Sequence, residues 1–156
     1  MRNFFFIIFT LIFVSCSAKE PLIDPINPQF ETISFDVVQK ELILKINIPS
    51  NLKNLINQWF DNKVKINGFD GQMTFTINDY REETSTIVGG KRIDIFLSFS
   101  LILTKPTLSQ KKYVEGSVTS FGTLTGDFSL NDFEVVIQNT QSDLIMRLSR
   151  DLQTKI

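Results

Sequence analysis

Residues 93–103 carry the pattern that most restricts the fold, an apolar side chain at every second position. The apolar positions are Ile93, Ile95, Leu97, Phe99, Leu101 and Leu103. Successive side chains of a β-strand point to opposite faces of a sheet, so this period of two predicts a long strand with one buried face. A strand of this kind needs neighbouring strands and a covering layer, which argues against an all-helical fold.

Other segments show the same period. Met73, Phe75 and Ile77 alternate with polar residues and predict a half-buried antiparallel strand. A polar connection is expected from Asp79 to Ser85, followed by a hairpin whose two-residue turn is Gly89-Gly90, because both turn positions tolerate positive φ. Residues 113–121 predict a further strand after a connection at 106–112.

Two shorter strands are predicted earlier in the chain. Residues 33–37 and 42–48 both alternate, with a polar break at Gln39 and Lys40 between them. These two segments either pair as a hairpin or continue as one bent strand.

Two segments show helical periodicity. The first follows Ser50, a suitable N-cap, and is expected to stop at Asn67-Gly68. Its apolar face comprises Leu52, Leu55, Ile56, Trp59, Phe60 and Val64, so Trp59 is interpreted as a core residue. The second helix opens with a capping box formed by Ser129 and Asp132. Its apolar stripe comprises Phe133, Val136, Ile137, Leu144, Ile145, Leu148 and Leu152.

This order of elements predicts an α+β fold, with the two amphipathic helices packed on one face of a mainly antiparallel sheet of four to five strands. The chain has 156 residues, 42% of them hydrophobic, which suits one domain with a sizeable core. We expect a signal peptide at 1–15, a lipidated cysteine with a flexible tether at 16–30, and a single α+β domain at 31–156.

The N-terminus has the layout of a secretory signal. Arg2 precedes an apolar run from Phe4 to Val14, which is too short for a membrane-spanning helix of about twenty residues. The run ends at Phe13-Val14-Ser15-Cys16, which resembles the lipobox of bacterial lipoproteins and implies a lipid on Cys16. The alternative is ordinary cleavage after Ala18, which would remove Cys16 with the signal.

Lipidation also explains the single cysteine, because a secreted chain with one cysteine cannot form an internal disulfide. Acyl chains on Cys16 would hold the domain stably on a membrane. Pro21, Pro25 and Pro28 indicate an extended tether after it. By resemblance to enteric sorting rules, Ser17 after the cysteine implies the outer membrane, with the domain facing the periplasm.

Composition argues against several function classes. The net charge of -1 is spread without a basic run, which argues against nucleic-acid binding. The chain has no histidine, which removes the usual nucleophile pairs and most zinc ligand sets, so we expect no enzyme activity, metal or cofactor. The acidic cluster of Asp79, Arg81, Glu82 and Glu83 is interpreted as a solvated loop rather than a catalytic acid pair.

The sheet face turned away from the helices is expected to be rich in serine and threonine. Phe96 and Ile102 interrupt it, and Val135 and Met146 lie off the apolar stripe of the final helix. The plain interpretation is a solvated surface. The alternative is that these four residues contact a partner.

From about Leu55 to Ile156 the sequence resembles small Gram-negative envelope lipoproteins. The residues that carry the resemblance are Gln58-Trp59-Phe60, Ile77-Asn78-Asp79, Tyr113–Val118, Leu148 and Leu152. The layout also resembles, more weakly, the lipopolysaccharide-assembly lipoprotein. Both resemblances imply a non-catalytic accessory role with an envelope protein partner. The alternative is a periplasmic lipid or small-ligand carrier, which would need an apolar cavity between helices and sheet.

Overall fold

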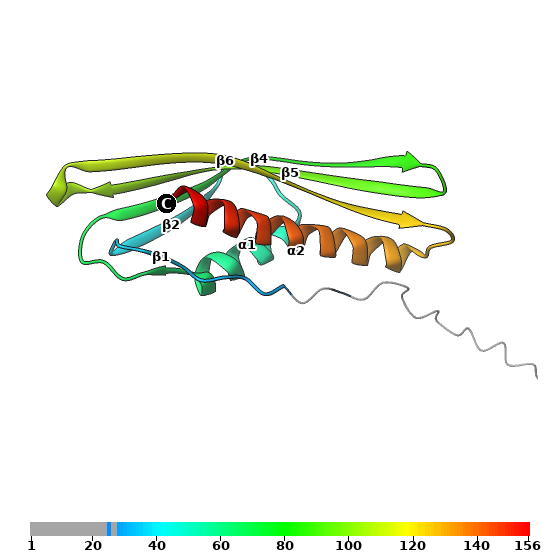
Figure 1. Cartoon of the computed structure of the whole chain (residues 1–156), viewed down its shortest axis with the longest axis horizontal. Coiled ribbons are helices and arrows are strands. Elements are labelled where there is room, and N and C mark those ends of the chain that lie inside the picture. Colours follow the sequence, from blue (N-terminus) through cyan, green and yellow to red (C-terminus); the bar gives the residue numbers. More distant parts are fainter. Residues whose placement is uncertain (1–24, 26–27) are drawn as a thin grey trace, which may run out of the picture.

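The computed structural model describes Pro25 and residues 28–156, and arranges them as a sheet of long strands with both helices on one side (Figure 1). Along the chain the elements are β1 (Ile33–Phe35), β2 (Gln39–Leu44), α1 (Ser50–Lys63), β3 (Val64–Ile66), β4 (Gln72–Ile87), β5 (Gly90–Lys105), a 3-10 turn (Pro106–Leu108), β6 (Gln110–Thr125) and α2 (Leu130–Lys155). The predicted signal peptide and Cys16 lie outside the described residues. In the described part, neither helix combines the length and apolar character that a membrane span requires.

The main sheet has four strands in the order β2-β4-β5-β6. The pairs β4/β5 and β5/β6 are antiparallel, whereas β2 runs parallel to β4. β1 and β3 form a separate parallel pair. The predicted α+β class with two helices over a mainly antiparallel sheet is therefore confirmed, but the sheet is mixed.

The expectation that residues 33–48 form a hairpin or one bent strand is wrong. β1 pairs with β3, while β2 begins where the backbone N–H groups of Val38 and Gln39 both reach the carbonyl of Gly71, at 3.2 and 3.3 Å. This contact turns the chain alongside the start of β4. α1 and β3 then form the crossover that a parallel β2/β4 pair requires.

β4 is longer than predicted, because the polar segment Asp79–Ser85 continues the strand instead of forming a loop. A register shift at Asn78 separates the pair Ile77/Phe99 from the pair Asp79/Ser98. The hairpin turn lies one residue earlier than expected, since Ile87 pairs with Gly90 across Val88 and Gly89. Gly89, the second turn residue, has a positive φ of 73°, whereas Val88 does not, so glycine is required at only one of the two turn positions.

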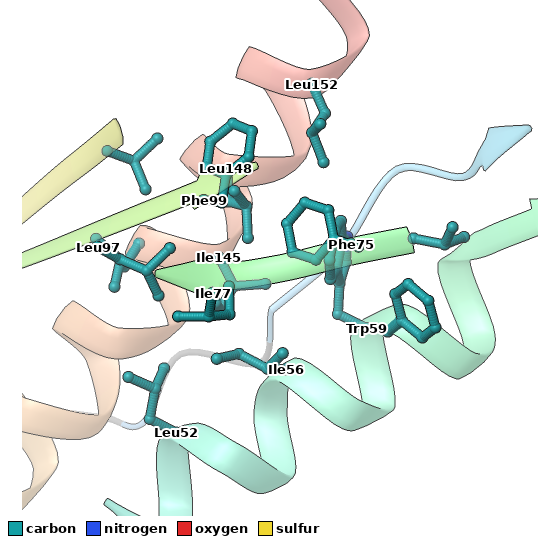
Figure 2. Close-up of a cluster of buried hydrophobic side chains, with 14 of the residues drawn as sticks. Leu52, Ile56, Trp59, Phe75, Ile77, Leu97, Phe99, Ile145, Leu148 and Leu152 are labelled. Carbon is teal, nitrogen blue, oxygen red and sulfur yellow. The ribbon is translucent and has the colours of Figure 1, made fainter. Parts of the chain in front are cut away.

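The core lies between the helices and the inner sheet face, where the alternating row of β5 is buried as predicted from Ile93 to Leu101, while Leu103 is partly buried (Figure 2). Trp59 is 0% exposed, and its ring centroid lies 5.6 Å from that of Phe75, which in turn stacks on Phe99 at 5.5 Å. This confirms Trp59 as a core residue. The buried residues contributed by the helices include Leu52, Ile56, Phe60, Leu144, Ile145, Leu148 and Leu152.

α1 begins at Ser50, but Pro49 occupies the N-cap position and no side chain caps the helix. The helix ends at Lys63, short of the predicted stop at Asn67-Gly68, because Val64 starts β3. Lys40, a residue of β2, caps the C-terminal end of α1. The ammonium group of Lys40 donates to the carbonyls of Phe60 and Val64 at 2.6 and 2.7 Å. Burial lowers the pKa of Lys40.

α2 starts with the predicted capping box. The N–H of Asp132 donates to Ser129 Oγ at 3.1 Å, and the N–H of Ser129 donates to Asp132 Oδ2 at 2.8 Å. Gly122 lets the helix approach β6, because a Cβ there would lie 2.4 Å from Thr140 Oγ1 and 2.6 Å from a methyl carbon of Val136. A larger side chain at position 122 would force these two side chains, or α2 itself, to shift.

Candidate docking surface on the outer sheet face

The side chains of even-numbered β5 residues point away from the helices, and the strand register places them in rows across the sheet. One row joins Arg81, Phe96 and Thr119, and the next joins Glu83, Asp94 and Phe121. These rows line a cleft of about 340 Å³ on the outer face. Arg92 also lines this cleft. We call it the arginine–phenylalanine cleft.

Two arginines lie over two phenylalanines in this cleft. The Arg81 guanidinium carbon is 4.7 Å from the ring centroid of Phe96 and bridges to Asp79 at 2.9 Å. The Arg92 guanidinium carbon is 4.3 Å from the ring centroid of Phe121. Each arginine is therefore held flat by one ring and one carboxylate, an arrangement that fixes its planar group.

The charges of the cleft are balanced within it. Arg92 donates to both oxygens of Asp94 at 2.7 to 2.9 Å, and this hydrogen bonding lowers the pKa of the Asp94 carboxyl. Both groups stay exposed to solvent, as does Phe121, a residue that is 57% exposed. The surface therefore offers flat, half-apolar groups rather than an uncompensated positive charge, which suits protein side chains better than a free anion.

A shallower, polar hollow of about 690 Å³ continues along the same face. There Asn78 Nδ2 donates to Ser100 Oγ at 3.1 Å, and the Tyr113 hydroxyl donates to Glu115, which raises the pKa of Tyr113. Thr76 and Ser100 are only 6% and 7% exposed. The interpretation of the whole face as solvated is therefore too simple, because its centre is covered by its own neighbours.

The structure separates the residues that the sequence grouped as possible contacts. Phe96 and Ile102 lie on the outer face as expected, and both are half-buried. Val135 is 7% exposed and belongs to the buried residues of α2, so its place off the predicted stripe does not make it a surface contact. Met146 is half-buried on the same helix. Cys16 lies outside the described residues, and its lipidation stays a prediction.

The arginine–phenylalanine cleft was missed because residues 79–85 were expected to form a loop. Once they continue β4, Glu82 and Glu83 point to opposite faces of the sheet. Glu82 accepts a hydrogen bond from the Tyr80 hydroxyl on the helix side, whereas Glu83 lines the cleft. The sequence signal was the alternation of Asp79, Arg81 and Glu83, which has the same period as the apolar rows.

A third cleft, of about 370 Å³, opens at the end of the molecule where α2 stops. Its apolar wall includes Phe35, Leu103 and Ile156, and Lys105 bridges Asp36 at its rim. This cleft is an open mouth between the helix layer and the sheet. Deeper between the layers, the described core side chains such as Trp59 and Leu97 are fully buried.

No protein-family model matches the sequence, and no curated protein matches it. Solved structures do resemble the fold. A minor lipoprotein from Acinetobacter baumannii is 13% identical, covering 74% of this chain and 89% of that chain with a TM-score of 0.46. The rare lipoprotein B from Shewanella oneidensis is 13% identical, covering 75% and 97% at 0.45. A putative lipoprotein from Caulobacter crescentus is 11% identical, covering 72% and 85% at 0.45.

Proposed function

We propose that this chain is a lipid-anchored envelope lipoprotein with a non-enzymatic role in outer-membrane assembly or transport. It would act by binding another envelope protein through the arginine–phenylalanine cleft. The observation that carries the proposal is the pair of arginines stacked at 4.7 and 4.3 Å on Phe96 and Phe121 beside a cleft of about 340 Å³. Arginine and aromatic side chains are enriched where protein interfaces concentrate their binding energy.

The anchoring part of the proposal rests on the N-terminal sequence. An apolar run that is too short to span a membrane ends at the small residue Ser15 and the single cysteine, Cys16. Mass spectrometry of the mature protein tests this part. We expect an N-terminal Cys16 that carries acyl chains, and an unmodified N-terminus at Lys19 would contradict it.

The partner-binding part is supported by how the cleft is built. Arg81 and Arg92 are already oriented by Asp79 and Asp94, so little side-chain freedom is lost when a partner binds. Phe121 keeps more than half of its surface exposed and supplies apolar area that a partner would bury.

Site-specific photocrosslinking in intact membranes tests this surface. A photoreactive amino acid at Thr119, which lines the cleft, should crosslink one discrete envelope protein, and Arg92→Ala combined with Phe121→Ser should remove that product. The matched control is the same photoreactive group at Lys53, an exposed position on the opposite, helical layer. Equal crosslinking from both positions, or no loss in the double variant, would contradict the proposal.

The open mouth at the end of α2 favours a second candidate, a lipid or small-ligand carrier. Its volume of about 370 Å³ and its mixed wall of Phe35, Leu103 and lysines would fit part of an acyl chain with an anionic head. Native mass spectrometry of the purified protein is the direct test. A co-purifying lipid that is lost in Leu103→Trp would support the carrier, and a ligand-free mass would argue against it.

A further inference from the structure

We propose that the end of the molecule around Phe69 and Leu108 contacts a phospholipid bilayer and inserts these two side chains into its surface. Two turns form this end, residues 68–71 before β4 and residues 106–109 between β5 and β6, and we call them the rim (Figure 1). This inference goes beyond the proposed function, because the proposed partner binding uses a different surface.

The rim exposes two large apolar side chains on turns that are bonded to each other. Phe69 is 100% exposed, and Leu108 is 58% exposed. The backbone N–H of Thr107 donates to Asp70 Oδ2 at 3.1 Å, so each apolar residue is next to a residue of this bond. A single exposed apolar residue is common on soluble proteins, whereas two on joined turns indicate a contact surface.

The backbone fixes the turn that carries Phe69 on both sides. The N–H of Gly68 donates to the carbonyl of Val37 at 3.0 Å, and a Cβ at Gly68 would overlap the backbone nitrogen of Val37. Gly71 has a φ of 88°, and a Cβ there would overlap the carbonyl oxygen of Thr104. The turn therefore holds Phe69 outward, and little backbone freedom is lost when the side chain enters a membrane.

The turn that carries Leu108 is also fixed. Pro106 begins the 3-10 turn and restricts its own φ, and the N–H of Ser109 donates to the carbonyl of Pro106 at 3.0 Å. Ser109 completes the turn with a positive φ of 49°. Both apolar side chains of the rim are thus displayed by rigid backbone.

The charged residues of the rim fit a bilayer better than a second protein. Lys105, Lys111 and Lys112 flank the turn that carries Leu108. Lys105 bridges Asp36, so this carboxylate does not present an uncompensated charge. Lysine stems lie along apolar surface and place their ammonium groups at the level of lipid headgroups. Protein interfaces are instead depleted of lysine and need about 800 Å² of complementary surface from each partner, which two projecting turns do not offer.

Contact through the rim would place the third cleft against the bilayer and leave the arginine–phenylalanine cleft free. Val37 and Lys105 line the third cleft and also lie against Gly68 and Gly71 of the rim. Phe96 lies nine residues before Lys105, the last residue of β5, which is about 30 Å along the strand. A partner protein could therefore bind the outer sheet face while the rim contacts lipid.

The depth of a fluorescent probe tests the proposal. The mature full chain carries an environment-sensitive fluorophore on Leu108→Cys and is bound to vesicles of phosphatidylethanolamine and phosphatidylglycerol. We expect a blue-shifted emission and quenching by nitroxide-labelled lipids. The matched control carries the same fluorophore on Val88→Cys, because Val88 is fully exposed at the opposite end of β4, about 50 Å away. Equal lipid quenching at both positions, or quenching at Val88 alone, would overturn the proposal.

A second substitution tests whether Phe69 supplies the contact. Added to the Leu108 probe, Phe69→Ser should lower the equilibrium constant for lipid contact about 10-fold, because it removes one large apolar side chain from the membrane. Val88→Ser should leave that constant unchanged. Phe69 is fully exposed, so its replacement does not disturb the core. No effect of Phe69→Ser would refute the proposal, as would a blue shift that rises with the density of protein on the vesicles, which would indicate a second copy.

The rim and the lipid anchor are tested separately. Flotation with the vesicles reports whether the anchor holds the chain, whereas the emission reports whether the rim enters lipid. A chain that floats while its Leu108 probe stays in water would retain the anchor and refute the rim. If the mature chain carries no acyl group, titration with the same vesicles replaces reconstitution, and no blue shift up to about 5 mM lipid would refute the rim.

Discussion

Replacement of Lys40 by methionine tests how α1 is held against the sheet. The ammonium group of Lys40 donates to the carbonyl of Phe60 at 2.6 Å and to that of Val64 at 2.7 Å, and it lies 4.8 Å from the ring centroid of Phe60. The helix ends without a glycine, at Lys63, so these bonds from β2 satisfy backbone carbonyls at its C-terminal end. Methionine keeps the apolar stem of lysine and removes only the charged donor.

The expected loss of stability follows from these contacts. A hydrogen bond to a charged group contributes about 1.5–3 kcal/mol, and a cation at a helix C-terminus adds about 0.3–1 kcal/mol. Desolvation opposes the charge, as the lowered pKa of Lys40 indicates, and water can reach part of the site. We therefore expect Lys40→Met to lower the free energy of unfolding by about 2–3 kcal/mol, near the lower end of the sum.

Urea unfolding at neutral pH, followed by the fluorescence of the buried Trp59, measures this loss. Lys53→Met is the matched control, because Lys53 is exposed on the same helix and the substitution should change stability by less than about 0.5 kcal/mol. A loss from Lys40→Met no larger than that of the control would refute the assignment of Lys40 as the C-terminal cap of α1.

Three further stability predictions follow from the packing of α2 and β4. Gly122→Ala should cost about 1–3 kcal/mol in urea unfolding, because its Cβ would lie 2.4 Å from Thr140 Oγ1. Ser129→Ala should cost about 1 kcal/mol in the same assay through loss of the N-cap, and no change would argue against the capping box. Burial and Glu82 raise the pKa of Tyr80 above its ordinary 10.0, so the folded chain retains a proton that the unfolded chain loses. The free energy of unfolding should therefore fall as pH rises above 10.0. Measured by urea unfolding over the same pH range, the Tyr80→Phe variant should lose less stability than the unaltered chain.

The side-chain periodicity of the sequence was sufficient to predict the core. The apolar row of β5, the buried face of α1 around Trp59 and the capping box of α2 all depend on residues close together in the chain. Such local patterns report which side of an element faces water, because a strand repeats every two residues and a helix about every 3.6. The class of the fold and the two helices followed from them.

Strand partners and strand ends were decided by the tertiary structure. β1 pairs with β3 and β2 pairs with β4. The chain changes partners where the N–H groups of Val38 and Gln39 donate to the carbonyl of Gly71, a contact between residues far apart in sequence. Residues 79–85 looked like a loop because they are polar, yet pairing with β5 satisfies those of their backbone groups that face β5, whatever their side chains are. That extension of β4 creates the arginine–phenylalanine cleft. Side-chain polarity is a local property of the sequence, whereas a backbone hydrogen-bond ladder exists only once its partner strand is in place.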